Sequence, residues 1–203
     1  MKNSLFFAGG LALVMMTVSC NNGAETDSAK VADSANDAKI DRAKDADTNN
    51  ARPSAMAEMK PDAEFAVAAA DGGMMEVQLG KMAQEKGVSK SIKNLGAMMV
   101  KDHSAANTEL MAAAKQKDIT LPASLSEKCQ KKVQDLSEKT GADFDKAYAD
   151  LMVSDHKDDI DAFKKEGEKG NDPQLSAWAK SKVPTLEHHL MMAEEAKKLV
   201  DKK

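Results

Sequence analysis

Beyond residue 60, apolar residues recur every three or four positions, and prolines and glycines divide this pattern into five segments. Such spacing places the apolar side chains on one face of an α-helix. Proline is tolerated in the first turn of a helix and glycine often follows the last turn, so these residues mark the helix boundaries. The expected helices are 61–86, 89–117, 124–139, 142–169 and 172–200.

Four of these helices are long, and the third is short. Gly87 and Gly170 allow only tight turns after the first and fourth helices, which predicts two antiparallel hairpins. Leu121-Pro122 breaks the chain between the hairpins, and Ser124-Leu125-Ser126-Glu127 has the pattern of a capping box that opens the short helix. The sequence therefore predicts an all-α fold: a four-helix bundle with an additional short helix in the crossover connection.

Each long helix turns one ionisable side chain toward the expected core when its residues are placed at intervals of about 100°. These side chains are Glu76, His103, Asp155 and His189. All four lie near the middle of their helices, so antiparallel packing would gather them into one layer. Burying such groups without partners costs roughly 2 kcal/mol or more each. They must therefore bond to one another, to water or to a metal ion.

Four further residues beside this layer are candidates for a supporting or alternative role. Asp102 falls at the edge of the apolar stripe of its helix, and His156 falls at the margin of another stripe. Met99 and Met152 stand one turn before His103 and His156. Thioether sulfur combined with imidazole favours copper, whereas methionine at helical spacing is also an ordinary core residue.

Two histidines and two carboxylates suit a single Fe, Zn, Mn or Cu ion. A di-iron centre in a helical bundle also needs a glutamate three residues before each histidine, and Val100 and Leu186 occupy those positions. The leading hypothesis is therefore a non-catalytic protein with a role in metal binding or envelope stress tolerance. The alternatives are a metal-dependent oxidoreductase and a metal-free structural or partner-binding protein, in which the layer is a hydrogen-bonded network.

Composition and charge exclude several other classes. The formal net charge is −4 and only 3% of residues are aromatic. No basic stripe is present to follow a phosphate backbone, so nucleic acid is not an expected partner. The sequence also contains no phosphate-binding loop and no Cys-x-x-Cys pair, and no serine lies on an inner face beside a histidine. Protein partners stay unknown.

The first 19 residues have the pattern of a bacterial secretion signal. Lys2 precedes an apolar run, too short for a comfortable membrane span, that ends in Thr17-Val18-Ser19-Cys20. This ending resembles a lipobox, whose cysteine becomes the lipidated first residue of the mature protein. We expect residues 1–19 to be a lipoprotein signal peptide and Cys20 to carry acyl chains, palmitate among them. An ordinary signal peptide with an incidental cysteine is the alternative.

A lipid on Cys20 would hold the protein to a membrane of the bacterial cell envelope, and Asn21 is consistent with sorting to the outer membrane, facing the periplasm. Residues 20–60 hold few large apolar side chains, too few to offset the entropy of ordering them. We therefore expect a disordered tether over 20–60 and the folded domain over 61–203. Cys129, then the only free thiol, is expected to be a partly buried apolar residue.

Several short runs in the folded part resemble one known family. They are Phe65, Gly72-Gly73-Met74, Glu76-Val77, Leu79-Gly80-Lys81-Met82-Ala83, Met99-Val100-Lys101-Asp102-His103-Ser104, Ile119-Thr120-Leu121-Pro122, Phe144-Asp145-Lys146-Ala147-Tyr148, Met152-Val153-Ser154-Asp155-His156, Pro184 and His189-Leu190. Together they resemble the domain-of-unknown-function 4142 family over about residues 62–200. The resemblance implies a ferritin-like fold and a place among outer-membrane lipoproteins, and it implies no biochemical role.

Two kinds of residue interrupt the helical pattern and predict local features. Gly72, Gly73 and Gly80 lie inside the first long helix, where glycine costs about 1 kcal/mol against alanine, so we expect a neighbouring backbone to approach closely there. Pro184 lies inside the last helix and predicts a kink one turn before His189.

Overall fold

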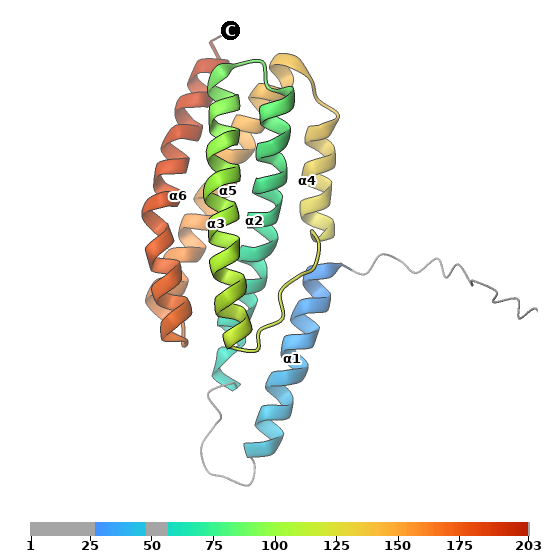
Figure 1. Ribbon diagram of the computed structural model, residues 1–203, viewed down its shortest axis with the longest axis vertical. Helices are drawn as coiled ribbons and strands as arrows, with labels where there is room; N and C mark the ends of the chain where they lie inside the picture. Colours follow the sequence, from blue (N-terminus) through green and yellow to red (C-terminus); the bar gives the residue numbers. More distant parts are fainter. Residues whose placement is uncertain (1–26, 48–56, 203) are drawn as a thin grey trace, which may run out of the picture.

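The computed structural model describes residues 27–47 and 57–202, and within these ranges the chain forms six α-helices, one short 3₁₀ helix and no strands (Figure 1). The all-α prediction is confirmed, and the boundaries of the five expected helices agree within a few residues. The elements are α1 (Ser28–Asp47), η1 (Ala57–Met59), α2 (Lys60–Lys86), α3 (Lys90–Gln116), α4 (Glu127–Ser137), α5 (Gly141–Lys169) and α6 (Pro173–Val200).

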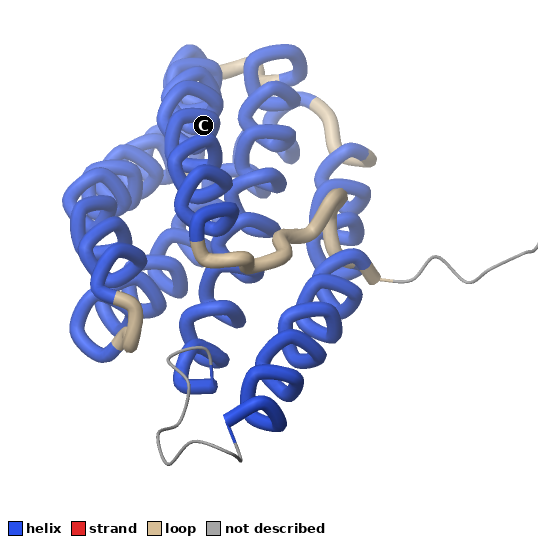
Figure 2. Tube along the Cα trace, turned by 60° about the horizontal axis from the view of Figure 1, so that its bottom comes forward, coloured by secondary structure: helices blue, strands red, loops and turns tan. Residues whose placement is uncertain are grey.

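The four long helices lie side by side as two hairpins (Figure 1). Helix α2 pairs with α3, and α5 pairs with α6, each pair being joined by a short turn. The hairpins pack together because α3 also contacts α6 and α2 also contacts α5. The short helix α4 lies in the long connection between the hairpins and packs on α2 and α5. Figure 2 shows this connection crossing one end of the helices.

Side-chain caps explain where two of these helices begin. Asp172 precedes α6, and its carboxylate accepts hydrogen bonds from the amides of Gln174 and Leu175. Helix α4 begins after Ser126, whose hydroxyl accepts from the amide of Cys129. Asp71 of α2 in turn accepts from both the amide and the hydroxyl of Ser126, at 2.8 and 2.6 Å. The helix therefore begins two residues later than expected, with Ser126 in place of Ser124 as the N-cap, because this tertiary contact holds Ser126 in position; Glu127 becomes the first helical residue, so the expected capping box does not form.

A glycine pair sets the closest approach between α2 and α3. A Cβ atom built on Gly80 would lie 2.7 Å from the carbonyl oxygen of Gly96, and one built on Gly96 would lie 2.6 Å from that of Gly80. Both distances are below van der Waals contact, so only glycine fits at this crossing, as expected for Gly80. Gly73 instead makes room for the side chain of Asn107, and nothing approaches Gly72.

Helix α1 contradicts the expected disordered tether over Ser28–Asp47. Ala32 and Ile40 are buried, and Asn36 exchanges two hydrogen bonds with the backbone of Thr120, at 2.9 and 2.7 Å. The composition of residues 20–60 predicted disorder because it reports only the small apolar area and no polar contacts. A narrow stripe of buried apolar residues holds this helix against the bundle, together with Asn36, which hydrogen-bonds to backbone groups of the α3–α4 connection.

The expected signal peptide, Cys20 and the remaining parts of the expected tether, 20–26 and 48–56, lie outside the described residues. In the part of the chain that is described, no helix combines the length and the apolar character needed to cross a membrane. Helix α6 continues through Pro184 as one helix from Pro173 to Val200.

Candidate metal centre

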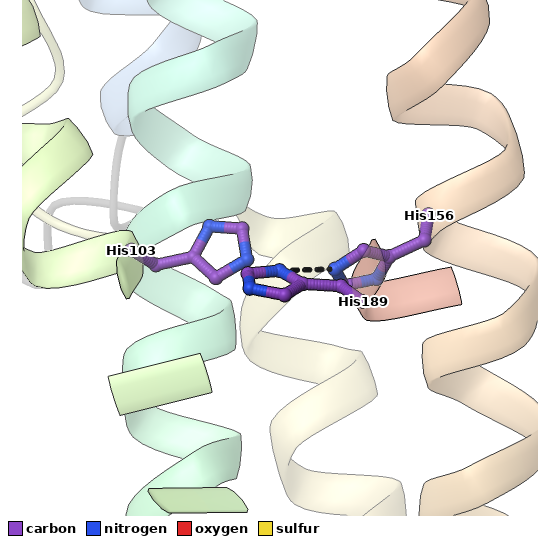
Figure 3. Close-up of side chains that lie close together, drawn as sticks. All are labelled: His103, His156 and His189. Atoms are coloured by element: carbon purple, nitrogen blue, oxygen red, sulfur yellow. Dashed lines mark hydrogen bonds between the residues drawn. The ribbon is translucent and has the colours of Figure 1, made fainter. Parts of the chain in front are cut away.

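A layer of polar residues interrupts the apolar core between the two hairpins. Above and below it, apolar side chains fill the space between the helices. Three imidazoles form its centre: His103 from α3, His156 from α5 and His189 from α6. Only 7%, 0% and 1% of their respective residue surfaces are exposed. Figure 3 shows the three rings converging from three different helices.

The three rings are close enough to share one ion. Each offers one ring nitrogen, and these three nitrogens lie within 4.8 Å of one another. The ring centroid of His103 lies 5.5 Å from that of His156 and 5.2 Å from that of His189. The Nε2 atom of His156 is 3.2 Å from the Nδ1 atom of His189 (Figure 3).

The other nitrogen of each ring is held by an acceptor outside the cluster. Glu76 of α2 places a carboxylate oxygen 2.8 Å from Nδ1 of His103. The carbonyl oxygen of Met152 lies 3.0 Å from Nδ1 of His156, and a carboxylate oxygen of Asp102 lies 3.0 Å from Nε2 of His189. Acceptors of this kind fix the tautomer and orientation of histidines that bind a metal through the opposite nitrogen.

The hydrogen-bond contacts of His156 and His189 need more protons than the two neutral rings carry. The chain of contacts from Met152 through His156 and His189 to Asp102 has three gaps, and each needs one proton to become a hydrogen bond. Two neutral imidazoles supply only two protons. One of the three contacts therefore lacks a proton, and if the carbonyl and the carboxylate accept both, the two nitrogens 3.2 Å apart face each other with lone pairs. A shared cation resolves this contact.

A third proton on the pair would also resolve the contact, but burial opposes it. Burial, followed by the neighbouring imidazoles of His103 and His189, lowers the pKa of His156 to about 3. Burial also lowers the pKa of His103 to about 4 and shifts that of His189 downward. All three rings are therefore neutral at physiological pH, which is the form that binds metal ions.

One nitrogen of the cluster has no hydrogen-bond partner in the described part of the chain. Nε2 of His103 is buried and forms no hydrogen bond with any described residue. A buried nitrogen that bonds to nothing is unusual, because the desolvation cost is then not offset. Nδ1 of His103 contacts Glu76, so Nε2 is the nitrogen of this ring that would bind an ion.

Two acids lie beside the imidazoles, of which Glu76 is buried and Asp159 is half-buried. Glu76 and Asp159 form a second group with His156 in which one ligand atom from each lies within 4.8 Å of the others. Burial raises the pKa of both acids to about 8, with further contributions from Asp155 at Glu76 and from Glu76 at Asp159. A cation bound beside these two acids would favour their charged forms and so oppose the effect of burial.

A cavity of about 220 Å³ adjoins the cluster. His103, His189, Glu76, Asp102 and Asp159 are among the residues that line it, and His156 is not. The cluster is therefore accessible from the side on which α3 faces α6.

Three of the four predicted core residues lie together in the structure, and His156 lies in the place expected for the fourth, Asp155. Glu76, His103 and His189 lie in one layer, as expected. Asp155 instead forms an ion pair with Lys132 of α4, at 2.6 Å, and belongs to neither candidate ligand group among the described residues. His156, expected at the margin, occupies the centre.

The reason for this exchange is the packing of α4. Asp155 and His156 are adjacent, and both fall within the broad apolar stripe of α5, so the helical wheel alone does not choose between them. Lys132 on α4 supplies the partner for the carboxylate, which turns His156 toward α6. Asp159 was missed, although its position three residues after His156 places both on one face of the helix.

The two methionines behave as core residues. Met99 and Met152 have no exposed surface and belong to the apolar cluster formed with residues such as Leu79, Ile92 and Phe144. Met152 contributes to the site through its backbone carbonyl, which accepts from His156. The copper site with sulfur ligands therefore loses the feature that distinguished it from ordinary core packing.

Comparison with known proteins gives one match. No curated protein and no solved structure matches this chain. Residues 45–196 match the family described as Domain of unknown function (DUF4142), and these residues include all of α2 to α5, most of α6 and every member of the histidine cluster. Since the match spans most of the chain, this protein belongs to the DUF4142 family.

Proposed function

We propose that this protein binds one transition-metal ion through His103, His156 and His189. The observation that carries the proposal is the set of three buried imidazoles whose inner nitrogens converge; two of these nitrogens lie 3.2 Å apart, and the third has no hydrogen-bond partner among the described residues. Glu76, Asp102 and the carbonyl of Met152 hold the outer nitrogens. The ligand set differs from the one expected from the sequence in that His156 takes the place of Asp155.

Three neutral imidazoles favour borderline metal ions over hard ones. Zinc, copper and iron accept such ligands readily, whereas magnesium and calcium prefer sites made of oxygen atoms. Three protein ligands also leave one position of a tetrahedral ion open, which is typical of reactive rather than structural zinc sites. Zinc and copper are therefore the first ions to test.

In this proposal the protein is a ferritin-like four-helix bundle of the cell envelope, anchored to the outer membrane through lipidated Cys20. The metal-binding role is non-catalytic, as a store or a buffer that supports tolerance of envelope stress. The cavity beside the imidazoles favours a second candidate, a metal-dependent oxidoreductase, because a closed storage site has no need of open space next to the ion.

Metal binding is tested on the full chain after treatment with a chelator and its removal. Titration with Co²⁺ in place of Zn²⁺ gives a visible spectrum that reports the ligand number, and elemental analysis gives the stoichiometry. We expect one ion per chain, loss of binding in His156→Ala and His189→Ala, and full binding in His188→Ala. His188 is the matched control because it neighbours His189 in the sequence and is exposed. Absence of binding by the unmodified chain, or equal loss in His188→Ala, would refute the proposal.

The membrane anchor is tested separately in the bacterial cell. We expect radiolabelled palmitate to enter the unmodified protein and not the Cys20→Ser variant, with the variant also released from the membrane pellet. Equal labelling of the two proteins would contradict lipidation at Cys20 and leave the metal site untouched.

A further inference from the structure

The cavity beside the histidine cluster is built differently on its two sides. On the inner side it meets polar groups, namely the imidazoles of His103 and His189 and the carboxyl groups of Glu76 and Asp159. The rest of its wall is largely apolar and comes from four helices. These residues are Ala69, Ala105, Ala106, Phe163, Trp178 and Leu186.

Aromatic rings and a polar bridge hold the apolar wall in place. The rings of Phe163 and Trp178 pack against each other with their centroids 5.5 Å apart. The indole nitrogen of Trp178 donates to a carboxylate oxygen of Glu109 on α3 at 3.0 Å, and Lys182 approaches the same oxygen to 2.5 Å. Helices α3 and α6 are thus joined beside the cavity, so the space does not depend on a mobile segment.

The cavity approaches the cluster at the position where an ion would lack a protein ligand. It touches His103 and His189 but not His156, so it reaches the three converging nitrogens from one side only. The buried Nε2 atom of His103, which has no hydrogen-bond partner within the described residues, belongs to a residue of the cavity wall. Polar space at a metal and apolar space away from it form the usual arrangement of a small-ligand site.

Size and wall chemistry define the class of ligand. A water molecule takes up about 30 Å³ in the liquid, so about 220 Å³ holds roughly seven non-hydrogen atoms and is too small for an organic cofactor. The one cationic side chain on the wall, Lys182, is already paired with Glu109. The wall thus offers no free positive charge for a carboxylate or phosphate group, and the metal ion is the group that would attract a ligand.

We propose that this cavity admits a small inorganic ligand of two or three atoms, of the class of dioxygen, peroxide or azide, to the open position of the bound metal ion. The inference rests on the proposed function, since it takes the histidine-bound ion as its starting point. An ion with such an open position differs from a closed structural centre, in which protein atoms fill all positions around the ion.

The test uses azide as the probe on the full chain loaded with Cu²⁺. Azide bound to Cu²⁺ gives a charge-transfer absorption band, so the band reports ligand binding and elemental analysis reports the metal. Ala106→Leu fills the cavity from α3, and Ala69→Val narrows it from α2. Ala112→Leu is the matched control, because Ala112 is also on α3 but is exposed and does not line the cavity.

We expect the unmodified chain and Ala112→Leu to bind azide equally. Ala106→Leu should retain one ion per chain and lose the azide band, and Ala69→Val should weaken the band, with circular dichroism confirming that both variants keep their helices. Azide binding that is unchanged in both cavity variants would overturn the inference. A chain that binds copper but never azide would overturn it as well, while the metal site itself would stand. Failure of the unmodified chain to bind Cu²⁺, Co²⁺ or Zn²⁺ would refute the proposed function, and this inference with it; a chain that binds Co²⁺ but not Cu²⁺ is tested with azide in its Co²⁺ form.

Discussion

Asp102 offers the sharpest test of how the proposed metal site is organised, because it would act on a bound ion only through His189. Its carboxylate lies 3.0 Å from Nε2 of His189, and its side chain is 29% exposed, whereas the imidazole is buried. Replacing Asp102 by Ala removes the acceptor that fixes the tautomer of this ring. The three imidazoles and the packing around them are left in place.

The expected loss follows from this contact. Removing the outer partner of a metal-binding histidine weakens metal affinity by about 10- to 100-fold, or about 1.4–2.7 kcal/mol. Because Asp102 is partly exposed, water can replace it as an acceptor, so we expect the lower half of that range. Asp102→Asn keeps an acceptor oxygen without the charge and should lose less. Without metal, the free energy of unfolding should fall by only about 1 kcal/mol.

Competition between the protein and a chromophoric chelator for Zn²⁺ measures these affinities. Asp135→Ala is the control, because Asp135 is an exposed aspartate of α4 that pairs only with Lys131. The order of affinity should be unmodified chain and Asp135→Ala, then Asp102→Asn, then Asp102→Ala. If Asp102→Ala binds zinc as tightly as Asp135→Ala, then Asp102 does not orient a ligand and the proton count at the cluster is wrong.

Three further predictions concern the fold itself. Burial raises the pKa of Glu166 from 4.5 to about 8, so between these pH values the folded chain holds a proton that the unfolded chain releases. As the pH rises through this range, the free energy of unfolding falls by up to about 1.4 kcal/mol per pH unit. In urea unfolding, the free energy of unfolding of Glu166→Gln should therefore rise relative to that of the unmodified chain from about pH 5 to about pH 8. A difference between the two chains that does not change with pH would contradict this. Gly96→Ala should lower the melting temperature despite a helix-propensity gain of about 1 kcal/mol, because its Cβ would lie 2.6 Å from the carbonyl oxygen of Gly80; an unchanged or raised melting temperature would show that the helices separate at little cost. Asp145→Ala should cost about 1–3 kcal/mol or more, because two amides of the α2–α3 turn lose their acceptor; unaltered hydrogen exchange at these amides would argue against the contact.

The helices and their ends were predictable from local sequence. Pro61 and Pro173 fix the backbone in the first turn of a helix, and Gly87 and Gly170 favour its end because glycine is a poor helix former; neither effect depends on the rest of the fold. The spacing of apolar residues likewise indicates which face of each helix is buried. These are short-range effects, so a linear reading of the chain captures them.

Helix α1 shows the limit of composition as a guide. Its few apolar residues predicted disorder, yet Asn36 bonds to the backbone of Thr120, 84 residues away in the sequence. The benefit of that contact exists only when the α3–α4 connection is in place. No property of residues 20–60 alone contains it.

The sequence by itself determined the all-helical fold, the family, and the presence of histidines and carboxylates in the middle of the long helices. Only the tertiary structure decided which of them meet. Asp155 and His156 are neighbours about 100° apart on one helix, and the rotation of α5 that brings His156 to His189 depends on Lys132 of α4 and on the partners across the core. The cavity also exists only between packed helices. Local sequence limits the rotation of a helix to a range, and the neighbouring helices select the angle within it.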